Sequence, residues 1–214
     1  VQHSALVPNR RGLEGAKTAK MDAIAIFLSA SEAHSKKNIN KSIEEALDVL
    51  GDVTRAAQEA GMWVRGYVST AFGCPYEGAV DPARPHEIVH QLFDLGVDEV
   101  SLGDTIGVAN PKQVRDFVKQ LSVDVPLEKV ALHMHDTRGT ALANVLAGLD
   151  SGVTIFDSAF GRESSSIFDR RARDRRTRES PLRSPHHRRR PGPGTRRWHP
   201  RPPVSSRPAA SSSP

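Results

Sequence analysis

Short apolar runs alternate with helix-like segments through residues 1–160, and this alternation constrains the fold more than any other feature of the sequence. The helix-like segments carry start signals, such as Ser42 with Glu45 in a capping box and Asn110 before Pro111. Strands that alternate with helices form βαβ units and build a parallel sheet, so we predict an α/β fold. The predicted strands span 4–7 (the weakest signal), 23–28, 63–68, 99–102, 129–135 and 153–156.

Polar residues that can carry chemistry follow the predicted strands directly. A (β/α)8 barrel places its active site at the carboxyl ends of its strands, so this arrangement favours a TIM barrel. A full barrel takes about 250 residues, and only five or six βα units are visible here, so we expect a barrel that is incomplete at both ends. No Gly-x-Gly-x-x-Gly turn follows any strand, which disfavours a dinucleotide-binding Rossmann fold. The polar segments are 29–32, 69–70, 103–105, 133–137 and 157–158.

The charge of the chain divides it into two predicted regions. Residues 1–160, the predicted partial barrel domain, hold 15 basic and 21 acidic residues, and their net charge of −6 is typical of a slightly acidic globular protein. Residues 161–214 hold 15 Arg, no Lys and 4 acidic residues, a net charge of +11, with 9 Pro, 10 Ser and only 8 hydrophobic residues. Such a segment cannot bury enough apolar surface to offset chain entropy, so we predict a disordered basic tail.

Two interpretations of the tail differ in their consequences. Its Arg clusters fit a nucleic-acid-binding arm, although only Trp198 offers a surface for base stacking. Alternatively, translation of GC-rich DNA out of frame produces runs of Arg, Pro, Ser and Ala. We favour this second hypothesis and do not expect a nucleic-acid partner.

Several classes of protein are disfavoured by simple counts. Cys74 is the only cysteine, which excludes an intrachain disulfide framework and a Cys-rich zinc site. No apolar run approaches the roughly 20 residues that span a bilayer, so no membrane partner is expected. Residues 1–12 lack the pattern of a signal peptide, and the chain lacks an initiating Met, which indicates a processed product or a fragment.

His133 and His135 are the sharpest chemical signal in the sequence. Because they stand at i and i+2 on a strand, both imidazoles project from the same face. Two neutral imidazoles on one face make half of a divalent-metal site. The alternative is two polar residues on a half-exposed strand, and the spacing alone does not decide between them.

Asp104 and Arg65 are further candidates, each with a structural alternative. Asp104, which follows a strand, could be a general acid/base or could cap its loop as an Asx-turn residue. Arg65, inside an apolar strand, needs an anionic partner, which could be a substrate carboxylate or a structural carboxylate. Cys74 has no feature of a low-pKa thiol, so we interpret it as structural. Three further histidines are interpreted as solvated helix or loop residues: His34, His86 and His90.

Several sequence blocks resemble the 3-hydroxy-3-methylglutaryl-CoA lyase family, in the same order and over about residues 4–159. The Arg-Gly-Tyr-Val-Ser and Gly-Cys-Pro-Tyr-Glu-Gly blocks point to the lyase branch of a wider superfamily of metal-dependent barrels. The matching blocks span 29–40, 64–69, 73–78, 101–107, 133–137 and 141–144.

This resemblance implies a (β/α)8 barrel that cleaves (S)-3-hydroxy-3-methylglutaryl-CoA into acetyl-CoA and acetoacetate, a step of leucine catabolism and ketone-body formation. The cofactor implied is Mg²⁺ or Mn²⁺, with His133 and His135 as ligands. Asp104 and Arg65 are implied as catalytic residues, and Arg65 and Asn38 as substrate-binding residues. A homodimer is expected for the complete protein, in the bacterial cytoplasm or the mitochondrial matrix.

The sequence also departs from the family pattern. The family's Arg-Asp-Gly motif, whose Asp binds the metal, is not in this sequence. The match stops at 157–159, before the family's Gly-rich loop with its catalytic Cys and before its metal-binding Asn. Arg138 stands where the family commonly has Tyr. We therefore expect this chain to be inactive. The alternatives are another acyl-CoA aldolase-type lyase or synthase of the same superfamily, and a non-catalytic fragment with a nucleic-acid-binding tail.

Overall fold

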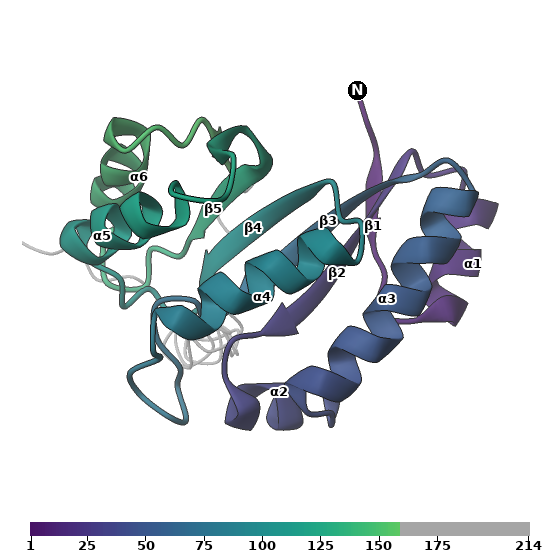
Figure 1. Ribbon diagram of the computed structural model, residues 1–214, viewed down its shortest axis with the longest axis horizontal. Coiled ribbons are helices and arrows are strands. Elements are labelled where there is room, and N and C mark those ends of the chain that lie inside the picture. Colours follow the sequence, from purple (N-terminus) through teal and green to yellow (C-terminus); the bar gives the residue numbers. More distant parts are fainter. Residues whose placement is uncertain (159–214) are drawn as a thin grey trace, which may run out of the picture. The chain divides into compact units, whose positions relative to one another are not determined.

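The computed structural model describes residues 1–158, in which six parallel strands alternate with helices (Figure 1). The strands pair in the order of the chain, β1 to β6, and every pair is parallel. The predicted α/β fold is therefore confirmed as a partial βα barrel, whereas the predicted tail at 161–214 lies outside the described residues. The strands are β1 (Ser4–Leu6), β2 (Ala23–Ser29), β3 (Trp63–Ser69), β4 (Glu99–Asp104), β5 (Val130–Met134) and β6 (Ile155–Phe156). The helices are α1 (Arg10–Thr18), α2 (Glu32–Ile39), α3 (Ile43–Glu59), α4 (Ala83–Asp94), α5 (Pro111–Leu121), the 3₁₀ turn η1 (Leu127–Lys129) and α6 (Ala141–Asp150).

The predicted caps start two of the helices. Ser42 accepts a hydrogen bond from the backbone N–H of Glu45, whose side chain in turn accepts one from the backbone N–H of Ser42, and α3 begins at the next residue. Asn110 and Gln113 make the same reciprocal arrangement at the start of α5, with Pro111 in its first turn. Local side-chain chemistry thus sets where these helices begin.

Alternation along the strands separates two faces of the sheet. On β3, Val64, Gly66 and Val68 are buried against the helices, and a Cβ on Gly66 would lie 3.0 Å from Leu92 of α4. Figure 1 shows α3 and α4 running alongside the strands. The intervening residues of β3, Arg65 among them, project from the opposite face, which we call the inner face. The helix-facing side of the sheet forms the core, with Ile24, Ile26, Leu28, Val64, Val68, Val100, Leu102, Val130 and Leu132 at its centre.

The structure departs from the sequence expectations in several elements. Strand β4 extends to Asp104, two residues past the predicted strand at 99–102, so Asp104 ends the strand instead of following it. Helices α1 and α2 were not predicted, because each is short and has few buried apolar residues. The strand predicted over 129–135 covers only Val130–Met134, since η1 takes up the residues before it. The strand predicted over 153–156 is reduced to Ile155–Phe156.

Helix α6 packs on β5 but leaves an apolar stripe in solvent. Leu142, Leu146 and Leu149 are 83%, 57% and 53% exposed and stand at i, i+4 and i+7, so they share one side of the helix. Within the described residues, β1 and β6 each pair on one side only. No helix among residues 1–158 is both long and apolar enough to span a membrane.

Candidate active site

Strand register gathers charged side chains on the inner face. The Cα atoms of Arg65 and Glu99 are partners between β3 and β4, and Gly103 is the partner of His133 between β4 and β5. Positions two apart on a strand share a face, so Arg65, Glu99 and His133 project to the same side. Asp157 directly follows β6 and completes the group.

Asp157 is the centre of this group. Its Oδ1 lies 2.8 Å from Nη1 of Arg65, and its Oδ2 lies 2.9 Å from Nδ1 of His133. The hydroxyl of Ser101 donates a hydrogen bond to the same Oδ2 at 3.1 Å. The carboxylate therefore joins three strands through its two oxygens. Sequence reasoning placed Asp157 after a strand but assigned it no role.

Arg65 lies between two carboxylates and an aromatic ring. Its Nε is 2.9 Å from Oε1 of Glu99, and its guanidinium carbon lies 5.0 Å from the centroid of Tyr67. Its Nη2 is buried and has no hydrogen-bond partner within the described part of the chain. An orphaned donor costs free energy unless a partner reaches it, which makes Nη2 available to an anionic oxygen. The ion-pair alternative for Arg65 is thus observed, and Nη2, which has no ion-pair contact among residues 1–158 either, remains for the substrate alternative.

The pKa values of the two carboxylates beside Arg65 are shifted in opposite directions. Burial tends to raise the pKa of Asp157, but His133, Arg65 and Ser101 outweigh it and lower this pKa below its usual value. Burial raises the pKa of Glu99, and the opposing effect of Arg65 is smaller. The lowered pKa of Asp157 favours its ionised form, which holds the arginine and the imidazole in place.

His133 and His135 meet the requirements for two ligands of one metal ion. Their Nε2 atoms are 3.0 Å apart, which is about the spacing of adjacent ligands around a six-coordinate ion. Because Nδ1 of His133 is directed at Asp157, the lone pair of this imidazole is favoured on Nε2. Burial, with a smaller contribution from His133, lowers the pKa of His135 and favours its neutral, ligating form. The predicted pair of ligands therefore fits a divalent ion.

Asp104 lies away from this group, on the helix-facing side of β4. It is fully buried, and its two oxygens accept hydrogen bonds from the backbone N–H groups of Val108 and Ala109, at 2.9 and 3.0 Å. Burial raises its pKa despite these hydrogen bonds. The geometry supports the loop-capping alternative directly. The acid/base role remains a prediction.

Asn38 and Cys74 lie on other elements than the inner-face group. Asn38 is exposed in the last turn of α2. Cys74 is buried, and its Sγ lies 2.9 Å from Oγ of Ser31, which supports its structural interpretation. A cavity of about 600 Å³ lies among the loops after β3, β4 and β5 and is lined in part by Cys74, Ile106 and Arg138.

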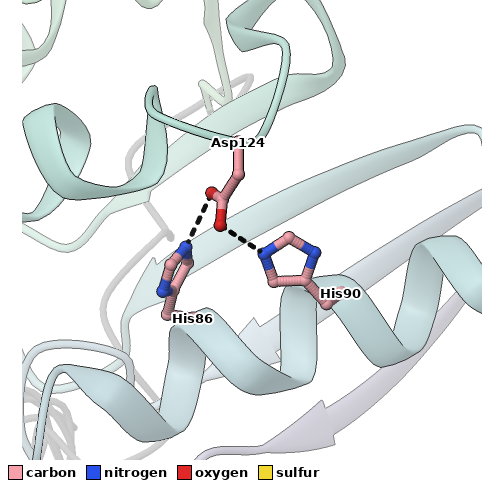
Figure 2. Close-up of side chains that lie close together, drawn as sticks. All are labelled: His86, His90 and Asp124. Atoms are coloured by element: carbon pink, nitrogen blue, oxygen red, sulfur yellow. Dashed lines mark hydrogen bonds and ion pairs between the residues drawn. The ribbon is translucent and has the colours of Figure 1, made fainter.

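The three histidines interpreted as solvated behave differently from one another. His34 is only 2% exposed, so its interpretation was wrong: α2, which was not predicted, turns it inward toward Tyr76. His86 and His90 are partly exposed on α4, and both bind Asp124 (Figure 2). This is a second place in the described residues where side chains of metal-ligating type lie together.

Comparison with known proteins gives consistent matches. Residues 3–161 match the model of the HMGL-like family. The hydroxymethylglutaryl-CoA lyase YngG of Bacillus subtilis is 48% identical over 161 residues, which are 75% of this chain and 54% of the relative. The mitochondrial hydroxymethylglutaryl-CoA lyase of Bos taurus is 45% identical over 159 residues, 74% of this chain and 49% of the relative.

Comparison with solved structures also matches the chain to HMG-CoA lyases. The crystal structure of the HMG-CoA lyase from Bacillus subtilis has a TM-score of 0.73 at 49% identity, over 74% of this chain and 53% of that chain. The present chain thus spans about half the length of the curated relatives that it matches.

Proposed function

The chain belongs to the HMGL-like family, and on this premise we propose that it carries part of the active site of a lyase that cleaves 3-hydroxy-3-methylglutaryl-CoA into acetyl-CoA and acetoacetate. The observation that carries the proposal is the inner-face group, in which Asp157 holds both Arg65 and His133. The relatives named above are lyases, which favours this activity over that of another acyl-CoA lyase or synthase.

The proposed reaction has three chemical changes that the protein has to promote. The C3 hydroxyl of the substrate loses its proton, the bond between C2 and C3 breaks, and the resulting enolate of acetyl-CoA takes up a proton. Arg65 is proposed to bind a substrate oxygen that carries negative charge, through Nη2, which has no hydrogen-bond partner among residues 1–158. Because Asp157 and Glu99 hold the other nitrogens of the guanidinium, Arg65 is oriented before substrate arrives.

His133 and His135 are proposed to hold the divalent ion that the family implies. Such an ion, when bound, would orient the substrate and stabilise negative charge on its oxygens. Burial favours the neutral form of His135, and the contact of Nδ1 of His133 with Asp157 leaves Nε2 of His133 facing the proposed ion. Imidazole ligands are compatible with Mn²⁺ as well as Mg²⁺, and we expect Mn²⁺ to bind more tightly, since Mg²⁺ prefers oxygen ligands.

The proposed role of Asp104 as acid/base can be separated from loop capping. Burial raises the pKa of Asp104, which is the direction of shift that acid/base chemistry by a carboxyl group requires. An Asp104→Asn variant keeps one oxygen that can accept from the loop but cannot take up a proton. Loss of turnover with unchanged stability would support acid/base chemistry. A loss of stability of about 1–3 kcal/mol would support capping.

The proposed activity is best tested in a chimera, because the chain covers about half of its relatives. Residues 3–158 replace the matching segment of the Bacillus subtilis lyase, and acetoacetate release from 3-hydroxy-3-methylglutaryl-CoA is measured with Mn²⁺ or Mg²⁺. We expect an active chimera. His133→Ala should lower its turnover by at least about 100-fold, since even residues that only orient a ligand contribute 10- to 100-fold.

His3→Ala in the same chimera is the matched control, because His3 is an exposed histidine with an Asp partner outside the site. A chimera that folds and binds the ion but releases no acetoacetate would refute the proposal. A homodimeric state and a location in the bacterial cytoplasm or mitochondrial matrix are proposed with this function and rest on family resemblance.

A further inference from the structure

A second cluster of ligand-type side chains lies on the helical layer, apart from the inner-face group. His86 and His90 stand at i and i+4 on α4, so their rings project from one side of the helix. Asp124 comes from the segment between α5 and η1 and reaches across to both (Figure 2). Its Oδ1 is 3.0 Å from Nε2 of His86, and its Oδ2 is 3.2 Å from Nε2 of His90.

The spacing of these atoms suits a small tetrahedral ion. One ligand atom from each residue can be chosen so that all lie within 4.8 Å of one another. Zinc binds His nitrogen and carboxylate oxygen at about 2.0–2.2 Å, which places neighbouring ligands of a tetrahedral site about 3.3 Å apart. Two histidines one helical turn apart already have the spacing found in helical zinc motifs. Only small side-chain movements would bring the three atoms around one centre.

The environment allows an ion to enter. The side chains of His86, His90 and Asp124 are 29%, 42% and 46% exposed, so water can occupy a fourth position. The two imidazole rings lie 5.0 Å apart and converge on a single carboxylate. A divalent ion would take one nitrogen lone pair from each of these imidazoles and one oxygen from the carboxylate.

We propose that His86, His90 and Asp124 form a binding site for a divalent transition-metal ion of the Zn²⁺ type, with water as the fourth ligand. The ion would fasten α4 to the segment that follows α5. Two imidazole nitrogens select such an ion over Mg²⁺, which prefers oxygen ligands. The site is separate from the proposed lyase chemistry, and its test does not depend on that chemistry.

Zn²⁺ binding to the full chain tests the proposal. The chain has nine histidines, so other residues can also bind Zn²⁺, and the informative quantity is the difference between matched variants. Isothermal titration with Zn²⁺ is carried out on the unchanged chain, on the double variant His86→Gln with His90→Gln, and on Asp124→Asn. His3→Gln is the control, because His3 also faces an Asp but has no second histidine beside it.

We expect the double variant to lose one Zn²⁺ per chain and Asp124→Asn to bind that ion at least tenfold more weakly. The control should match the unchanged chain, and Mg²⁺ should give no signal at this cluster. With Co²⁺ as the probe, the visible absorption of a tetrahedral site should appear in the chain with His133→Ala and His135→Ala and vanish when His86 and His90 are also replaced.

The same Zn²⁺ stoichiometry and affinity in all variants would overturn the proposal. Circular dichroism separates that result from misfolding, since the three side chains are on the surface and their replacement should leave the helical signal unchanged. If the double variant did lose its helical signal, Asp124→Asn would decide the matter, because the amide removes the negative charge and keeps both histidines: its oxygen accepts from one imidazole and its NH2 group donates to the other.

Discussion

The carboxylate of Asp157 contacts three side chains of the inner face. Its two oxygens serve different partners, Arg65 on one side and His133 with Ser101 on the other. The first contact sets the orientation of a guanidinium. The second favours the proton on Nδ1 of the imidazole and leaves Nε2 for the proposed metal ion. Asp157 therefore orients both the side chain proposed to bind substrate, Arg65, and a side chain proposed to bind the metal, His133.

Asp157→Asn should weaken metal binding without unfolding the protein. The amide has one oxygen, so it cannot accept from both Arg65 and His133, and the imidazole loses its fixed orientation. In the chimera, the Mn²⁺ concentration that gives half-maximal acetoacetate release should rise by about 10- to 100-fold. Asp150→Asn, an exposed carboxylate at the end of α6, is the control. An unchanged Mn²⁺ requirement would show that Asp157 does not position His133.

His34 should make stability depend on pH. Burial lowers its pKa below the ordinary value of 6.5, and Glu77 opposes this only in part. Below about pH 6.5 the unfolded chain therefore binds a proton on this imidazole that the folded chain does not yet bind. The free energy of unfolding falls as pH drops through this range, by at most about 1.4 kcal/mol per pH unit from one group.

The variant His34→Phe keeps a ring of similar size beside Tyr76 but cannot titrate. Between pH 6.5 and 5, we expect its free energy of unfolding in urea to fall less steeply than that of the unchanged chain. His3→Gln, at an exposed histidine, should leave the slope as it is. If the slopes with and without His34 are equal, its protonation is not linked to folding.

The residues of the inner face could be predicted only in part. His133, His135 and Arg65 were recognisable because a pair at i and i+2 and a charge inside an apolar strand are local patterns. Asp157 was not, since its partners lie 24 positions away in His133 and 56 positions away in Ser101. The register between paired strands brings these residues together, and a short stretch of sequence does not reveal that register.

At the scale of elements, glycines mark where a helix meets the sheet. A Cβ on Gly148 of α6 would lie 2.5 Å from Leu132 and 3.3 Å from Phe156. Leu132 is fully buried, so it has little room to move aside. The absence of a side chain at Gly148 is therefore what lets α6 approach β5 and β6 closely.

Gly148→Ala should destabilise the protein although alanine favours helices. Overpacking typically costs about 1–3 kcal/mol, which exceeds the gain in helix propensity of about 1 kcal/mol. Gly15→Ala in α1 is the matched control, because nothing lies within 4 Å of the position that its methyl group would take. That variant should be more stable by about 0.5–1 kcal/mol. Urea unfolding measures both, and a stabilised Gly148→Ala would contradict the close approach.

Elements with strong local signals could be predicted, and weak ones could not. The starts of α3 and α5 were visible because Ser42 and Asn110 cap them through their own side chains. Helix α2 was missed because only two of its residues, His34 and Ser35, are buried, and neither is apolar. Its place is set by contacts elsewhere in the chain, including Glu77, which accepts a hydrogen bond from the backbone of Ala33.

At the scale of the whole molecule, the exposed stripe on α6 favours self-association. Leu142, Leu146 and Leu149 are each more than half exposed on one side of the helix, and grouped apolar side chains at a surface are typical of association sites. Within residues 1–158, β1 and β6 each pair on one side only, and such sheet edges add to this tendency.

The double variant Leu142→Glu with Leu146→Glu should increase the monomer fraction at micromolar concentration, by about tenfold or more in the dissociation constant, as measured by sedimentation velocity. Val123→Glu is the control, because Val123 is 84% exposed but stands alone. Equal association of the double variant and the unchanged chain would assign self-association to another surface.

The alternating faces of β3 have a consequence for how the chain tolerates mutation. Growth at low temperature, or a chaperone, compensates for lost stability but not for lost chemistry. Substitutions at Val64 and Val68, which pack against the helices, should therefore be rescued by cooling in the chimera. Substitutions at Arg65 should not be rescued. A screen for lyase activity at two temperatures would then divide the seven residues of β3 into two alternating sets. Substitutions in one set would be temperature-sensitive, and substitutions in the other would abolish activity at both temperatures.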